Sequence, residues 1–210
     1  LLPPSIILLE RPQPTGNLEA RLTGGNVLGR WRRHLDVDSE IQLRAYYDRA
    51  QRNDPSFNDD LDTIDVDLQH RFVPATDHLI IWGANYRLMG NRNRGKGVFA
   101  LQPAFSRDQL FSAFVQDQIS WNDTVRATIG TKLEHNDFSG FEVQPSVRAA
   151  WDITAGHTFW AAVSRAARIP TRLERDVAID TNDPAGNPVI RLLGNPDFEA
   201  EELIAYELGY

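Results

Sequence analysis

Arginines are the side chains of this sequence best suited to holding a ligand. Two occur in a segment rich in Gly, Asn and Arg, and two lie three residues apart at the end of an alternating segment. They are Arg92, Arg94, Arg165 and Arg168. A guanidinium can bind a carboxylate or phosphate through two parallel hydrogen bonds, so we predict these four as candidate ligand-binding residues. The alternative for the second pair is a structural role, in which each arginine holds a loop to neighbouring strands.

Other polar clusters are weaker candidates for chemistry. Asp65 and Asp67 share one face of an alternating segment, but no base accompanies them. Residues 59–62 carry three aspartates, which could offer oxygen ligands to a hard cation, but the segment lacks the glycine-spaced pattern of a calcium loop. The five histidines are spread singly, without metal-ligand spacing. They are His34, His70, His78, His135 and His157. We therefore predict no catalytic residue, no metal site, no cofactor and no enzyme.

Composition excludes several classes of protein. The net charge is −7, and the 22 basic residues are scattered, so nothing favours nucleic acid as a partner. Cysteine is absent, which excludes disulfides and thiolate metal sites. No run approaches the ~20 apolar residues of a transmembrane helix. The mean hydropathy of −0.40 resembles that of a soluble protein, but such an average also arises where apolar and polar residues alternate.

Strict alternation is the dominant pattern of the chain. In residues 124–134 and 141–152, every second residue except Thr131 is apolar and the intervening ones are mostly polar. This pattern is typical of a strand with one apolar face. Similar patterns follow at 26–35, 40–48, 62–72, 78–88, 109–121, 157–167 and 202–210. The longest exceed the usual strand length of about five to six residues and match the ~9–11 residues of a tilted bilayer-crossing strand.

The connections and the aromatic residues also favour a membrane barrel. Connections predicted as short fall at 36–39, 73–77, 122–123 and 153–156, and long ones fall at 51–60, 90–108 and 168–201, with 136–140 as the exception. Apolar-face aromatics lie near the strand ends: Phe72, Trp121, Trp151 and Phe159 by the short connections, and Tyr47, Tyr86, Phe111 and Phe141 by the long ones. Short turns on one side, longer loops on the other and two aromatic belts are typical of outer-membrane barrels.

We therefore predict an all-β fold, an antiparallel up-and-down meander of long strands that is a fragment of a large transmembrane β-barrel. Residues 1–16 are predicted to be a Pro-rich lead-in or loop. Residues 17–210 are predicted to form a partial β-barrel of about nine or ten strands, truncated at both ends and without a plug domain. Outer-membrane lipid is then an expected partner.

Several short sequence motifs resemble those of the TonB-dependent outer-membrane receptors and occur in the family's order and approximate spacing. They occupy residues 24–31, 113–118, 130–135, 164–171, 194–199 and 207–210. Ala200-Glu201 stands where the family often has Pro-Glu. The resemblance implies a plugged barrel of ~22 strands in the bacterial outer membrane. It also implies TonB-energised uptake of an iron–siderophore, haem or cobalamin, a small-molecule ligand such as a metal chelate, and contact with the TonB complex through a plug domain absent here.

Two other folds and two other roles stay open on the sequence alone. A complete small outer-membrane barrel, an enzyme or adhesin, would need another strand within 17–23. A soluble β-sandwich binding module would pack its apolar faces on each other. With Lys96, residues 90–96 are electropositive and could attract an anionic ligand. The same residues could instead repel self-association or bind lipopolysaccharide phosphates.

Overall fold

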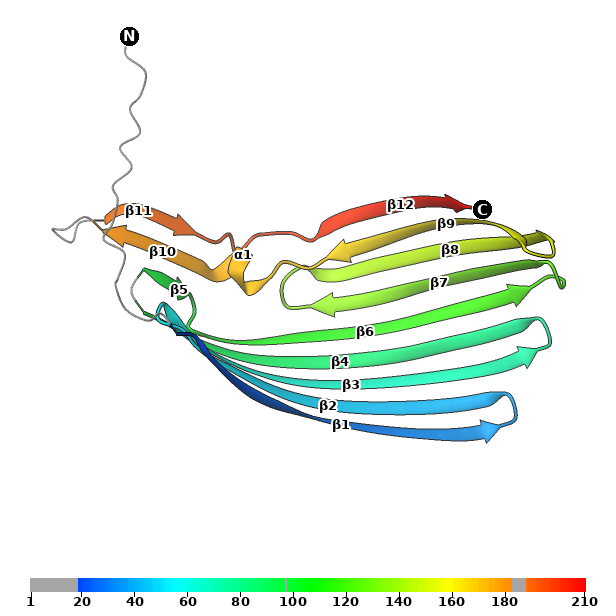
Figure 1. The fold of residues 1–210 in the computed structure, drawn as a ribbon, viewed down its shortest axis with the longest axis horizontal. Helices are drawn as coiled ribbons and strands as arrows, with labels where there is room; N and C mark the ends of the chain where they lie inside the picture. Colours follow the sequence, from blue (N-terminus) through cyan, green and yellow to red (C-terminus); the bar gives the residue numbers. More distant parts are fainter. Residues whose placement is uncertain (1–18, 97, 183–187) are drawn as a thin grey trace, which may run out of the picture.

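Nine antiparallel strands form one curved sheet in the computed structural model, which describes residues 19–96, 98–182 and 188–210 (Figure 1). The predicted lead-in, residues 1–16, lies outside the described residues. The strands, in their order across the sheet, are β1 (Arg21–Asp36), β2 (Ser39–Asn53), β3 (Phe57–Ala75), β4 (His78–Gly95), β6 (Phe105–Ser120), β7 (Val125–Asn136), β8 (Gly140–Thr154), β9 (His157–Arg168) and β12 (Glu201–Gly209). The all-β meander predicted from the alternation is confirmed.

A smaller sheet extends the molecule beyond one end of the long strands (Figure 1). It contains β5 (Phe99–Leu101), β10 (Val177–Asn182) and β11 (Pro188–Leu193), in the order β11-β10-β5. A short helix, α1 (Arg172–Asp176), precedes β10. Within the described ranges, no helix is both long and apolar enough to cross a membrane.

The face of the sheet that carries the apolar side chains is exposed. Ile129, Val147 and Val163 lie directly opposite one another on three strands, and their exposed fractions are 48%, 49% and 46%. Such side chains are normally buried in a water-soluble protein. The polar face holds the most buried charged groups, among them Asp65 and Glu134 at 6% and 5% exposed. Among the residues that the structure describes, the apolar faces do not pack on each other, so the β-sandwich alternative is wrong.

Aromatic side chains form rows near both ends of the exposed face, as predicted. Tyr86 lies opposite Phe111, and His135 lies between Phe111 and Phe141 in the same row. At the other end, Trp151 lies opposite Phe159. Aromatic rings prefer the two interfaces between lipid and water, so the rows bracket an apolar band.

Three segments that the sequence predicted as loops contain strands. Residues 51–60 form the ends of β2 and β3 instead of a loop, joined by residues 54–56. Residues 90–108 contain the end of β4, all of β5 and the start of β6, and residues 168–201 contain α1, β10 and β11. The prediction failed because the apolar alternation ends with the lipid, whereas backbone hydrogen bonding between neighbouring strands does not depend on side-chain polarity.

In the described part of the chain, the two edges of the large sheet do not close on each other. β1 and β12 are the two outermost strands, and residues 21–23 belong to β1 and do not form an additional strand. The nine strands therefore do not make a complete small barrel, and that alternative is wrong for this chain.

The ladder between β8 and β9 ends before the strands do. Pairing runs from Thr154–His157 to Ser146–Ser164 and stops there. The next residue of β8 is Pro145, which has no N–H to donate. β8 and β9 therefore separate at the end of the sheet nearest to α1.

Candidate functional site

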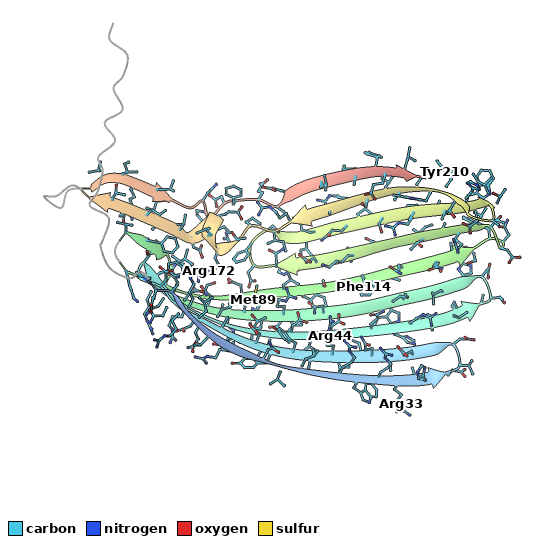
Figure 2. The ribbon with its side chains drawn as sticks, viewed as in Figure 1. Arg33, Arg44, Met89, Phe114, Arg172 and Tyr210 are labelled. Atoms are coloured by element: carbon cyan, nitrogen blue, oxygen red, sulfur yellow. The ribbon has the colours of Figure 1, made fainter. Side chains whose placement is uncertain are left out.

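The chain after β9 folds over part of the inner, polar face of the sheet and forms one wall of an open cavity there. We call residues 169–176, which include α1, the strap; Figure 2 labels Arg172 on the strap and Met89 on β4. The cavity between the strap and strands β3, β4, β6 and β7 has a volume of about 440 Å³. Its polar lining comprises Asp59, Asn91, Asp108, Gln109, Asn136, Thr171 and Arg172, and its apolar lining comprises Leu61, Met89, Leu101, Leu110, Phe138, Ile169, Pro170 and Leu173.

Strand register explains how these side chains meet. Leu61 on β3 lies opposite Asn91 on β4, and Asn91 lies opposite Ser106 on β6. Two residues along, Met89 lies opposite Asp108. Because side chains directly opposite in a sheet project to the same face, the inner face presents mixed polar and apolar groups to the strap.

Asp59 and Asp108 are the carboxylates of the cavity wall. The Asn91 and Asn93 side-chain amides donate to Asp59 Oδ1 at 3.0 and 3.1 Å. The Ser106 hydroxyl donates to Asp108 Oδ1, and Asp108 is 8% exposed. Among the described residues, neither carboxylate has a cationic group within 4.0 Å.

Arg172 fixes the strap to the strands. Its Nε lies 2.8 Å from Asp176 Oδ2, and the two side chains are 11% and 14% exposed. Its terminal nitrogens donate to the Asn91 side-chain oxygen and to the Pro103 carbonyl. Sequence reasoning missed Arg172, although its spacing of four residues from Asp176, behind a Thr-x-x-Glu capping pattern, is a readable signal.

The start of α1 is a second anchor point. The Thr171 side chain accepts a hydrogen bond from the Glu174 N–H, while the Glu174 carboxylate accepts one from the Thr171 N–H at 2.7 Å. Arg168 donates to both Glu174 and Glu201, each at 2.7 Å. The Arg168 hydrogen bonds, followed by those of Thr171, lower the pKa of Glu174 to about 2.

Arg165 lies where β8 and β9 separate. It donates to the Val143 carbonyl oxygen, and its Nη2 is 3.2 Å from Glu142 and 2.5 Å from Glu202. The guanidinium thus occupies the gap that Pro145 leaves in the ladder. Arg165 and Arg168 both have carboxylate partners, and their predicted ligand contact remains a prediction.

Arg92 and Arg94 lie on β4, not on a loop, which corrects the predicted position of residues 90–95. They alternate with the inward-facing Asn91 and Asn93, so their side chains belong to the outer face, and both are exposed. The Arg92 guanidinium lies 5.9 Å from the centre of the Phe105 ring. The structure therefore separates these two arginines from Arg165 and Arg168, and ligand contact by either pair is untested.

The remaining polar candidates make contacts within the sheet and do not form a separate site. Arg87 pairs with buried Asp65 at 2.8 Å, and Arg44 lies 3.6 Å from Asp67. The carboxylates of residues 59–62 divide between the two faces, so they do not converge. Across the described ranges, no group of three or more His, Cys, Asp or Glu side chains could hold a metal ion.

The fold and the inner face together define a class of protein, a membrane β-barrel wall with an apolar exterior and a polar interior. A family model described as "TonB dependent receptor-like, beta-barrel" matches residues 11–210. The chain therefore belongs to the TonB-dependent receptor family, as part of its barrel. This is a family of outer-membrane receptors and not of enzymes.

Known relatives are longer than this chain. An iron-regulated outer membrane virulence protein of Vibrio cholerae is 24% identical over 137 residues, which is 65% of this chain and 20% of that protein. The siderophore receptor PirA of Pseudomonas aeruginosa has a TM-score of 0.72 at 20% identity, over 90% of this chain and 36% of the receptor. A variant of the ferric enterobactin receptor PfeA of that species has a TM-score of 0.76 at 15% identity, over 90% and 32%. These structures share the fold.

Proposed function

We propose that the whole gene product takes up a scarce ligand of the iron–siderophore, haem or cobalamin class across the outer membrane. Energy for uptake is proposed to come from the TonB complex, which would contact a plug domain that is not part of this chain. Family membership supports this proposal, and so do the names of the V. cholerae protein and of the solved siderophore receptors.

The observation that carries the proposal is the division of the sheet into two faces. A row of half-exposed Ile129, Val147 and Val163 faces outward, where hydrocarbon would cover it. The inner face buries charged groups and holds a cavity of about 440 Å³ under the strap. This size falls in the range of small-molecule sites, roughly 300–1,000 Å³.

The domain assignment and the ligand-binding residues are part of the proposal. Residues 17–210 are proposed to be one section of a larger barrel. Arg165 and Arg168 could contact a ligand only by sharing or giving up their carboxylate partners. Arg92 and Arg94 could contact one only from the outer face of β4.

The test is growth of a strain that lacks the gene, with and without a plasmid that carries the whole gene. Under iron limitation, ferric siderophores of several chemical types and haem are supplied singly, and cobalamin is tested in a strain that requires it. We expect the plasmid to restore growth on at least one ligand, only when TonB is present. Growth that does not depend on the gene, or on TonB, for any ligand would contradict the proposal.

A further inference from the structure

The cavity wall carries an excess of negative charge. Each of its two carboxylates keeps one oxygen without a partner in the described part of the chain, because the side-chain hydrogen bonds of Asp59 and Asp108 all reach Oδ1. Arg172, the cation in the lining, is neutralised by Asp176 at 2.8 Å. Arg175 stacks on the Phe138 ring at 4.6 Å and does not line the cavity.

The neighbouring cations are also compensated. Arg87 lies 2.8 Å from Asp65, and Arg168 lies 2.7 Å from both Glu174 and Glu201. A polyanionic ligand in this cavity would therefore meet two uncompensated carboxylates and would have to compete for cations that already have partners. Like charges at such short range repel, most strongly where water is excluded.

Most of the other lining residues are apolar and would favour a ligand with an apolar body. Leu61, Met89, Leu110 and Phe138 contribute apolar side chains from four positions around the cavity. A cavity of this kind binds the apolar body of a ligand, while a few polar groups fix its orientation. The charged groups of the lining that lack an ionic partner, Asp59 and Asp108, are acceptors, so the groups that complement them on a ligand are N–H or O–H donors.

We infer that the ligand of this cavity is a cationic or amine-bearing compound with an apolar body, held by Asp59 and Asp108, and not a polyanionic chelate. The inference rests on the proposed function only in treating the cavity as part of the uptake path. A charged donor on a carboxylate makes a strong, short hydrogen bond. We expect each carboxylate to account for about tenfold in affinity for a cationic ligand.

A matched pair of ligands tests this inference on the whole gene product, purified in detergent micelles. The probes are the iron-55 complex of a linear trihydroxamate with a free terminal amine, which is singly cationic, and the same complex after acetylation of the amine, which is neutral. A ferric tris-catecholate supplies the triply anionic case. We expect the cationic complex to bind about tenfold or more tightly than the acetylated one, and the anionic complex to bind most weakly.

Variants then locate the charge preference. Asp59→Asn and Asp108→Asn should each weaken binding of the cationic complex about tenfold relative to the acetylated complex. Asp62→Asn is the matched control, since Asp62 lies on the same strand but on the outer face, where Tyr47 and Arg49 contact it. All comparisons are made at equal amounts of folded protein. If a variant fails to fold, the ligand pair on the unaltered protein decides alone.

The outcomes separate this inference from the proposed function. Equal binding of the two hydroxamate complexes, preference for the anionic complex, or no binding of any probe would overturn the inference. Charge-selective binding without TonB-dependent uptake in cells would support the inference and contradict the proposed function. TonB-dependent uptake of all three probes with equal efficiency would support the proposed function and contradict the inference.

Discussion

Arg172 shows how one side chain can decide whether the strap stays on the sheet. Replacing it with Met removes its hydrogen bonds to the Asn91 side chain and the Pro103 carbonyl. It also leaves the Asp176 carboxylate without its cation in a site where that side chain is 14% exposed. Breaking a buried ion pair costs about 3–5 kcal/mol. We expect Arg172→Met to release residues 169–176, with a large rise in amide hydrogen exchange there and little change in the central strands.

A pair on the small sheet provides the control for Arg172. Arg191 lies 3.2 Å from Asp180, but the two side chains are 56% and 46% exposed, so solvent screens their interaction. Arg191→Met should change hydrogen exchange very little. Equal effects of the two substitutions would show that Arg172 does not hold the strap on the sheet.

The sequence predicted Arg165 and Arg168 as site residues but missed Arg172, which shows how much of the site can be predicted from sequence. The sequence singled out the first two by residue type, but their partners come from distant strands and from the helix, as with Glu142 and Glu201. Arg172 contacts Asn91, which lies 81 positions away in the chain. Side chains that meet only through strand register and a folded-back connection cannot be paired from local sequence spacing.

At the scale of elements, the start of α1 should respond to pH. Hydrogen bonds from Arg168 and Thr171 hold the pKa of Glu174 at about 2, below its ordinary value of 4.5. A carboxyl group whose pKa is lowered by folding stabilises the folded state above the unfolded pKa, and this contribution is lost as the pH falls from about 4.5 towards 2. Cleavage of the strap by an acid-stable protease should therefore increase over that range.

Substitution of Glu174 tests the assignment of this pH response. Glu174→Gln should raise cleavage at pH 7 and flatten its dependence between pH 4.5 and 2. Glu199→Gln, at an exposed carboxyl in the same connection, should keep the original profile. A profile that is unchanged in Glu174→Gln would assign the response to another group.

The strands themselves were predicted well, and their ends were not. Alternation identified the centre of all nine strands of the large sheet, because lipid on one side requires an apolar residue at every second position. Beyond the lipid this constraint stops, so residues 57–61 and 90–95 belong to β3 and β4 without an alternating apolar pattern. The small sheet was missed for a related reason, since β5 has only three residues and depends on β10 for pairing.

At the scale of the whole molecule, the assignment of the large sheet to a barrel wall depends on what covers its outer face. Val147 lies in the middle of β8, between the aromatic rows that contain Phe141 and Trp151, and is 49% exposed. If lipid covers it, an arginine there must enter hydrocarbon, which costs about 2–4 kcal/mol near the centre of a bilayer. Val147→Arg should lower the free energy of unfolding of the whole gene product in lipid vesicles by about this amount.

Gln144→Arg, on the polar face of the same strand, should lower the free energy of unfolding much less, because its side chain enters the barrel interior. The measurement is denaturant titration followed by tryptophan fluorescence, with both variants at equal protein-to-lipid ratio. An equal loss for the two substitutions would mean that the apolar row meets protein or water instead of lipid, and the physical basis for assigning this sheet to a barrel wall would be lost.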